Sequence, residues 1–358
     1  MRARVICLLA GVSGIATSAV AGGVERAPFS SGILFQEGDY AEFSLGYGDP
    51  NVSGVLGIGS GDALSGYLTY SLALKKALSD KLDLAIILNE PIGADINYPS
   101  GTGYLLEGTT ANLQAAAITG LLRYEVQDNI SVYGGIRAEQ AKGDVSISLG
   151  GTPVYLLSTN RQLAWGYIVG AAWEKPEIAA RVALTYTSDI THELNSTENG
   201  VATGSFETTV PQALNLEFQT GIAEDTLLFG SVRWQEWSAF DISPAAYLTA
   251  FFNPQGLPLA YYQSDRITYS LGVGRKFNDT WSGAVTLGYE PSNGDVTGNL
   301  GPVDGFKSLG LAASYTRDTM TVTAGVSYFQ IGDATTSIGA NFADNDGIAA
   351  GIRVGVGF

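Results

Sequence analysis

Apolar and polar residues alternate along most of this chain, and the alternation is clearest at its end, in residues 346–358. One parity of that stretch is wholly apolar and ends in an aromatic ring: Ile348, Ala350, Ile352, Val354, Val356 and Phe358. The other parity holds glycines and a single arginine, Arg353. A period of two residues predicts a β-strand with one apolar face.

The same alternation recurs in pairs of segments joined by short turns that carry Asp, Asn or Pro. These residues bend the backbone by side-chain hydrogen bonding or by a preset φ. Single strands are predicted at 38–48 and 346–358, and hairpins pair 66–78 with 82–90, 112–126 with 130–147, 162–174 with 177–190, 213–223 with 226–240, 266–277 with 280–290 and 306–316 with 319–331.

Long connections separate the hairpins, at 49–65, 91–111, 148–161, 191–212, 241–265, 291–305 and 332–346. Six hairpins and two single strands make fourteen strands. An even strand number, with short turns at one end and long loops at the other, is typical of bacterial outer-membrane barrels. We therefore predict an all-β fold: a 14-stranded antiparallel transmembrane β-barrel with both termini at the periplasmic, short-turn end.

Charged residues fall opposite the apolar faces of the strands, which a soluble sandwich would also show. Two observations favour a membrane barrel. The predicted strands are much longer than the roughly 5–6 residues usual in globular proteins. Aromatic residues also gather near strand ends, as in interfacial girdles: Tyr70, Tyr124, Trp165, Trp173, Trp281 and Tyr289.

Composition agrees with a barrel and excludes some partners. The chain is 45% hydrophobic and 15% charged, below the roughly 25% charged residues of soluble domains. Outside the N-terminus no apolar run is long enough for a transmembrane helix, so helical spans are not expected. The net charge is −16 and the only basic cluster is Arg2 with Arg4, so we expect no nucleic-acid partner.

The N-terminus has the pattern of a signal peptide over residues 1–21. Arg2 and Arg4 precede an apolar run, and Ala19-Val20-Ala21 has the small-x-small form of a cleavage site near Ala21. The only cysteine, Cys7, leaves with this leader. Residues 22–37 then form a short N-terminal hatch or plug segment, or a flexible terminus, ahead of the barrel at 38–358.

Three segments of the sequence resemble a known family. Residues 84–95 (LAIILNEPIGAD), 237–240 (WSAF) and 277–292, which begin FNDTW and end GYEPS, are similar in order and spacing to motifs of the FadL-type outer-membrane transporters (OMPP1/FadL/TodX-like). Those proteins carry long-chain fatty acids and other hydrophobic compounds. The resemblance covers roughly residues 66–358. It departs from the family at the start, because residues 22–37 are shorter than the usual hatch and lack its Asn-Pro-Ala motif.

The resemblance implies a lateral opening near the third strand. Asn89, Pro91 and Gly93 interrupt that strand, and proline cannot donate a ladder hydrogen bond. In the family this strand is kinked inward, so that an apolar substrate leaves through the wall into the membrane. The alternative is that Pro91 only begins the following loop.

Candidate substrate-binding residues come from three places. The plug segment offers an apolar group, the lumen offers cations for a carboxylate, and loop 241–265 offers exposed aromatic rings for capture. They are Phe29, Ile33, Leu34 and Phe35; Arg123, Arg137 and Arg233; and Phe251 and Phe252. The alternatives are lumen ion pairs for the arginines and packing over the barrel mouth for the loop.

The predicted function is passive uptake of long-chain fatty acids or similar hydrophobic small molecules across the Gram-negative outer membrane. We expect no enzymatic activity, cofactor or metal. The partners expected are outer-membrane lipid and, through Phe358, the barrel-assembly machinery. The alternatives are a general diffusion porin and an outer-membrane lipid hydrolase. For the hydrolase the only histidine, His192, is interpreted as an incidental loop residue because sequence neighbours do not make a triad.

Overall fold

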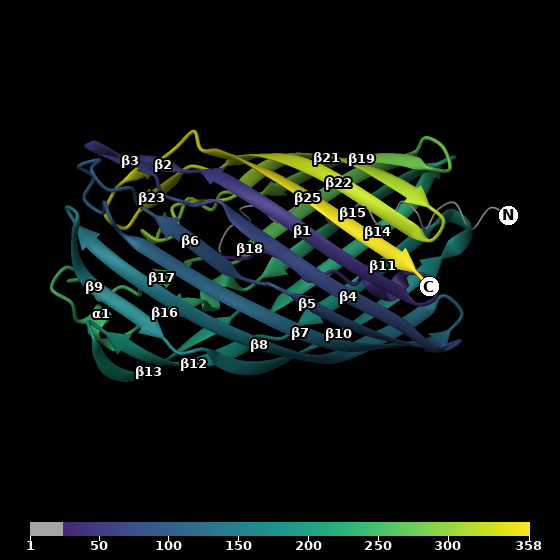
Figure 1. Cartoon of the computed structure of the whole chain (residues 1–358), viewed down its shortest axis with the longest axis horizontal. Coiled ribbons are helices and arrows are strands. Elements are labelled where there is room, and N and C mark those ends of the chain that lie inside the picture. The colour runs from purple at the N-terminus through teal and green to yellow at the C-terminus, as the bar shows by residue number, and fades with distance from the viewer. Residues whose placement is uncertain (1–23) are drawn as a thin grey trace.

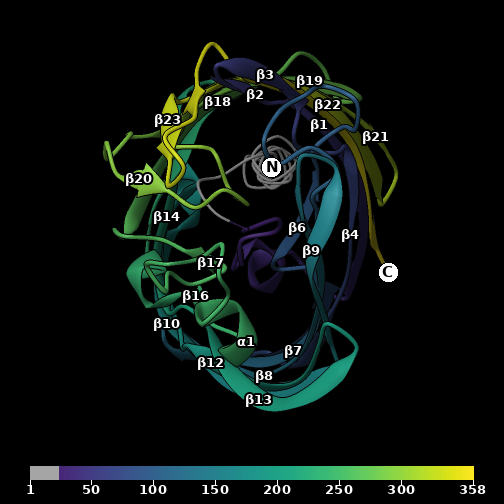
Figure 2. The same cartoon turned by 90° about the vertical axis from the view of Figure 1, so that its left-hand side faces the viewer.

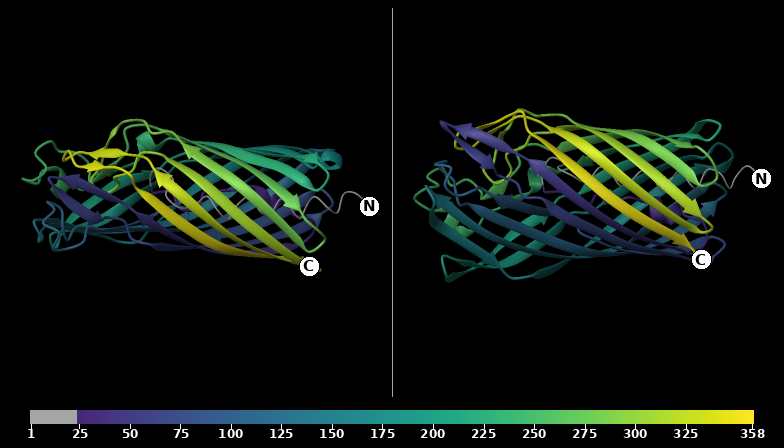
Figure 3. Two further views of the ribbon diagram at one scale, coloured as in Figure 1. Left: turned by 90° about the horizontal axis from the view of Figure 1, so that it is seen from above. Right: turned by 45° about the horizontal axis from the view of Figure 1, so that its top comes forward.

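The computed structural model describes residues 24–358, which form a closed antiparallel β-barrel (Figures 1 and 3). The predicted signal peptide lies outside the described residues. Fourteen strands make the wall, and each strand predicted from the sequence is present: β1 (Tyr40–Asn51), β4 (Tyr67–Ser79), β5 (Leu82–Asn89), β7 (Thr110–Gln127), β8 (Ile130–Leu149), β10 (Gln162–Lys175), β11 (Ala180–Thr187), β14 (Ala213–Ala223), β15 (Thr226–Gln235), β18 (Arg266–Lys276), β19 (Trp281–Glu290), β21 (Phe306–Arg317), β22 (Met320–Ile331) and β25 (Asp346–Gly357).

The last strand closes the ring, as its alternation predicts. β1 pairs with β25 on one side and with β4 on the other. Leu45 and Ile352 face each other in this closing register. The backbone N–H of Phe358 donates to the carbonyl of Asp39 at 3.0 Å, so the terminal residue lies beside the start of β1 at the short-turn end (Figure 1).

The outer surface of the wall is apolar and the inner surface is polar. Large hydrophobic side chains on alternate positions of the strands are solvent-exposed in the isolated chain. A soluble protein rarely leaves so continuous an apolar band uncovered, whereas a membrane barrel places it in lipid. The aromatic residues predicted as girdles are all on this surface: Tyr70, Tyr124, Trp165, Trp173, Trp281 and Tyr289.

The short turns show why Asp and Asn recur there. Asn129, Asp225 and Asp318 have positive φ, of 68°, 55° and 55°, a region that Asn and Asp tolerate better than other side chains. The turn after β10 differs from the predicted Lys175-Pro176 turn. A 3₁₀ turn, η4 (Pro176–Ile178), occupies it, and β11 begins only at Ala180.

The long connections predicted at 148–161 and 191–212 contain strands that the sequence pattern did not indicate. β9 (Thr152–Thr159) and the hairpin of β12 (Ile190–Glu198) and β13 (Val201–Val210) extend the wall beyond the apolar band. In β12 the inward residues are buried, but the outward ones, such as Thr191 and Glu193, are polar. This extension meets water rather than lipid, so the apolar outer face that marked the other strands is missing.

At the long-loop end, the loop at 241–265 lies over part of the barrel mouth (Figure 2). It contains β16 (Asp241–Ile242), α1 (Ala245–Leu248) and β17 (Ala260–Tyr261). A small sheet joins β2 (Ser53–Leu56), β3 (Ile58–Asp62), β20 (Val296–Thr297), β23 (Ala334–Thr336) and β24 (Asn341–Phe342). Beneath it Tyr98 and Tyr104 stack at 5.6 Å in a buried cluster with Phe342. Among the described residues, no helix is long and apolar enough to cross a membrane.

Candidate functional site at a break in the barrel wall

The N-terminal segment, residues 24–37, lies inside the ring of strands (Figure 2, dark purple). Its 3₁₀ turn, η3 (Gly32–Phe35), buries Ile33 and Leu34. Together with Phe29 these side chains pack against small and apolar inward residues of the wall, among them Ala85 and Leu121. Burial of three large apolar side chains holds the segment in the lumen.

Polar contacts fix the same segment to the wall. The Ser31 N–H and hydroxyl both donate to one carboxylate oxygen of Glu217, at 2.9 and 2.6 Å. Asn215 donates to the carbonyl of Phe29, and the Lys75 ammonium donates to the carbonyl of Gln36 at 2.8 Å. Charge-assisted bonds of this kind are stronger than neutral ones, so the segment is held along its whole length.

The wall is interrupted beside this segment. β5 ends at Asn89, and the chain pairs again with β7 only from Gly93, where β6 (Gly93–Asn97) begins. The ladder between β4 and β5 stops at the pair Ser71↔Asn89. Beyond it, β4 has no ladder partner on this side at Leu68–Tyr70, within the described part of the chain. We call residues 90–92 and the facing edge of β4 the wall break.

The N-terminal segment takes the place of the missing strand partner. The backbone N–H of Arg26 donates to the Pro91 carbonyl at 2.9 Å, and the N–H of Gly93 donates to the Val24 carbonyl at 2.8 Å. These two bonds flank an antiparallel bridge between Glu25 and Ile92. Because proline has no N–H, residue 91 can offer only its carbonyl to a neighbouring strand.

The Arg26 side chain lies across the wall break. Its guanidinium is 2.5 Å from the Asp95 carboxylate and stacks 3.9 Å from the centre of the Tyr67 ring. A Cβ on Gly93 would come within 2.5 Å of the Arg26 Nε atom, so glycine at position 93 leaves the space that the arginine fills. The contacts of Arg26 therefore connect the segment, β4 and β6.

An apolar cavity of about 50 Å³ lies between the wall break and the mouth. Val24 and Ile92 line it at the break, and Phe240, Leu259 and Leu300 line it from the loops. His192 is also part of its lining. Residues of the wall break and residues of the loops at the mouth thus line one cavity.

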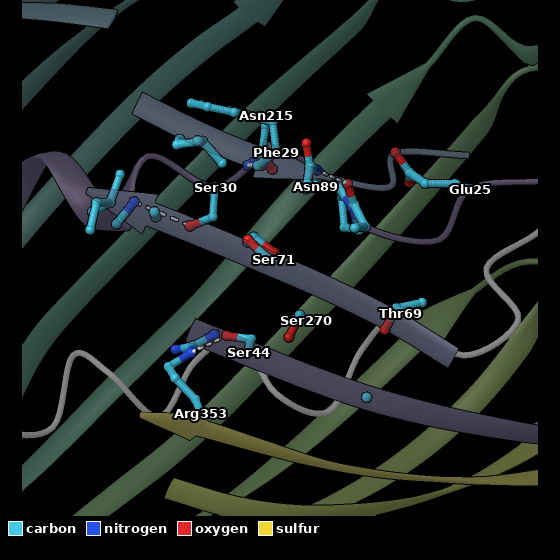
Figure 4. A pocket seen from close by; sticks show the side chains of 18 of the residues that line it. Glu25, Phe29, Ser30, Ser44, Thr69, Ser71, Asn89, Asn215, Ser270 and Arg353 are labelled. Atoms are coloured by element: carbon cyan, nitrogen blue, oxygen red, sulfur yellow. Dashed lines mark hydrogen bonds between the residues drawn. The ribbon is translucent and has the colours of Figure 1, made fainter. Parts of the chain in front are cut away.

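A second cavity, of about 260 Å³ and with a mixed polar and apolar lining, lies on the other side of the segment (Figure 4). Ser44, Ser71 and Asn89 line it, with Arg353 from the closing strand. It reaches the wall break at Tyr70. Its lining mixes polar and apolar side chains, whereas that of the other cavity is almost wholly apolar, so burial of an apolar molecule costs less in the other cavity.

The three lumen arginines predicted to bind a carboxylate are each engaged by protein carboxylates. Arg123 pairs with Asp83 and Glu174, Arg137 with Glu139, and Arg233 with Glu25. The structure thus places these arginines in ion pairs within the lumen, which was the alternative to binding a substrate carboxylate. Phe35 packs against the apolar cluster of Phe29, Ile33 and Leu34, and its ring also lies 4.7 Å from the Arg123 guanidinium.

The two loop phenylalanines occupy different positions. Phe252 packs against Tyr155 and Tyr247 over the mouth, whereas Phe251 is 82% exposed. Burial raises the pKa of the Tyr155 phenol, and its hydrogen bond to the Glu198 carboxylate raises it further. The phenol therefore stays neutral within this aromatic cluster.

Two residues of the site were missed in the sequence. His192 was interpreted as a loop residue, but it lies on β12 with its side chain fully buried. Its place in a period-2 run with Ile190 and Leu194 was the available signal. The role of Arg26 could not be predicted from the sequence, because only the fold brings it to Asp95, which is 69 positions away.

Comparison with known families decides the kind of barrel. The family model described as outer membrane protein transport protein (OMPP1/FadL/TodX) matches residues 60–351. The chain belongs to this family. It is therefore an outer-membrane β-barrel with the fold of the family's transporters for hydrophobic compounds. A search of curated proteins finds no match.

Solved structures agree on the fold. A FadL homologue from Pseudomonas aeruginosa superposes with a TM-score of 0.73 at 15% identity, covering 97% of this chain and 99% of that chain. The toluene transporter TodX of Pseudomonas putida gives 0.65 at 11% identity, covering 97% and 98%. The toluene transporter TbuX of Ralstonia pickettii gives 0.63 at 12% identity, covering 98% and 97%.

Proposed function

We propose that this barrel takes up small hydrophobic molecules passively and releases them sideways through the wall break into the membrane. The observation that carries the proposal is the wall break itself, which borders the apolar cavity on the inside and the apolar band on the outside. Each methylene kept out of water contributes about 0.8 kcal/mol. Lateral exit therefore avoids the cost of returning an apolar molecule to water.

Within the family's range, the cargo we propose is a small, largely neutral compound rather than a long-chain fatty acid. An apolar cavity of about 50 Å³ favours the smallest hydrophobic compounds, because they require the least displacement of its closely packed lining. Arg123, Arg137 and Arg233 are already paired with carboxylates, so they offer no free cation to a fatty-acid headgroup. Two proteins with similar structures, TodX and TbuX, are described as toluene transporters, and CymD is described as a monoaromatic hydrocarbon channel.

The remaining roles follow from position. Residues 24–37 serve as a plug, because a lumen of this width is not filled by wall side chains alone. Phe251 is the most exposed aromatic side chain of loop 241–265, although its ring contacts Phe252, so it is our candidate for first contact with cargo. Phe358 ends the closing strand and is proposed as the contact for the barrel-assembly machinery. A leader cleaved near Ala21 directs export.

Uptake of a labelled monoaromatic hydrocarbon by Gram-negative cells tests this function. We expect cells that express the chain to accumulate the label faster than cells without it, while purified protein in planar bilayers shows almost no steady conductance. Equal uptake with a large steady conductance would instead identify a general diffusion porin. If uptake equals that of cells without the chain and no conductance is measured, both the proposed uptake function and the porin function are excluded.

A further inference from the structure

The imidazole of His192 is the one chemically distinctive group in the apolar cavity. It occupies an inward position of β12, is fully buried, and lines the cavity beside Leu194 and Phe206. Its Nε2 atom lies 3.4 Å from Oε1 of Glu139, which is also fully buried. Glu139 in turn is 3.1 Å from the Arg137 guanidinium.

This arrangement assigns the two ring nitrogens different roles. A carboxylate facing arginine accepts hydrogen bonds, so the imidazole nitrogen directed at Glu139 is the one that carries the proton. The other nitrogen, Nδ1 of His192, is then an acceptor. It is buried and has no hydrogen-bond partner in the protein. A buried acceptor without a donor is unfavourable, and a ligand that brings a donor removes that cost.

The other polar groups of the cavity are already used. The Thr159 hydroxyl donates to the carbonyl of Gly143, and the Thr208 hydroxyl donates to the carbonyl of Asp241. The Asn112 amide donates to Asp95. Among the described residues that line the cavity, His192 is the only one with a buried polar atom that lacks a partner.

Charge and size narrow the ligand further. The described lining contains no Asp, Glu, Lys or Arg, and the carboxylate of Glu139 lies directly behind the imidazole. An anionic headgroup would therefore meet an acceptor nitrogen and a like charge. The cavity, at about 50 Å³, is smaller than the roughly 150 Å³ of an engineered apolar cavity that binds benzene, so its lining has to move for a single ring and has to move further for any larger ligand.

We infer that His192 makes the apolar cavity selective for neutral, single-ring compounds that carry one hydrogen-bond donor, such as phenols or benzylic alcohols, over hydrocarbons of the same size. The inference rests on the proposed uptake function and narrows its substrate class. The ligand O–H donates to Nδ1 of His192, while the ring packs against the aliphatic lining. His192 is thus a residue that determines specificity.

Competitive uptake of labelled p-cresol and p-xylene, which have the same shape, tests the inference. Four strains are compared, which express the wild-type chain, the His192→Leu variant, the His192→Gln variant or no barrel protein. A fifth strain expresses Leu194→Val. This variant is the matched control, because it changes the size of the same cavity without changing its polarity. Loss of one neutral hydrogen bond predicts that His192→Leu lowers the p-cresol to p-xylene uptake ratio roughly threefold to tenfold. His192→Gln retains an acceptor and is expected to restore part of the ratio, and Leu194→Val to leave it unchanged.

Heat-modifiable migration in gels verifies that each variant is folded. A ratio that is the same in folded His192→Leu and wild type overturns the inference, as does an equal drop for both compounds. In either case p-xylene uptake above that of cells without the barrel leaves the proposed uptake function intact. If the wild-type chain takes up neither compound, the uptake function itself fails and the inference fails with it.

Discussion

A disulfide bond between positions 25 and 92 is expected to stop uptake, and reduction of that bond is expected to restore it. The variant combines Glu25→Cys with Ile92→Cys. These residues form the antiparallel bridge between the N-terminal segment and the wall break. If cargo leaves through the break, the segment has to separate from residues 90–92, and a covalent link between them prevents it.

The geometry suits such a bond. The flanking hydrogen bonds, from Arg26 to Pro91 and from Gly93 to Val24, make 25 and 92 a non-hydrogen-bonded pair. Such pairs have Cα atoms about 4.5 Å apart, within the range that a disulfide spans. The sequence has one native cysteine, Cys7, in the predicted leader, so competing thiols are not expected in the mature barrel.

Uptake is measured in oxidised and reduced cells, with each single cysteine variant as a matched control. Glu25→Cys alone also shows the effect of losing the Glu25–Arg233 ion pair. We expect the oxidised double variant to fall to the uptake of cells without the barrel, and both single variants to be insensitive to reduction. Full uptake by a completely oxidised double variant would show that the segment does not have to leave the break.

Deletion of residues 24–37 is expected to turn the barrel into an open, water-filled pore. The segment fills the lumen through Phe29, Ile33 and Leu34 and is anchored at Glu217. Without it, the inner wall presents charged and polar side chains around an empty lumen. Barrels of somewhat larger strand number conduct water and ions when they have no plug.

Planar-bilayer conductance provides the measurement for the deletion. The wild-type chain is expected to show almost no conductance, whereas the deletion variant is expected to show steady conductance steps like those of a porin. Leu34→Ala is a graded control that weakens one buried contact and is expected to give brief openings. A folded deletion variant that conducts no better than wild type would show that the loops at the mouth, rather than the segment, seal the barrel.

The wall of this barrel was predictable because lipid imposes a pattern on every strand. Alternation in segments such as 112–126 and 346–358 gave strand bounds within a few residues, since each strand needs an apolar outer face. The same logic failed at β12 and β13, whose outer face meets water. There Thr191 and Glu193 resemble loop residues although the backbone continues as a strand.

The site was less predictable because it depends on contacts between distant segments. Pro91 and Gly93 marked an interruption in the sequence, but their partners Val24 and Arg26 lie in a segment with no clear period. Parity correctly placed lumen arginines on the inner face, yet it gave no information about which carboxylates face them. Arg123, for example, pairs with Asp83 and Glu174 rather than with the neighbouring Glu125.

The central claim is that cargo passes between β4 and residues 90–92, and trapping of cargo at that position tests it most directly. A photoreactive amino acid replaces Tyr70 at the wall break, and in a control strain it replaces Leu311, which faces lipid on β21. Cells are irradiated during uptake of a labelled monoaromatic compound. The account predicts more label at position 70 than at 311, and loss of that excess when positions 25 and 92 are joined by the disulfide. Equal labelling at both positions, with or without the disulfide, would contradict it.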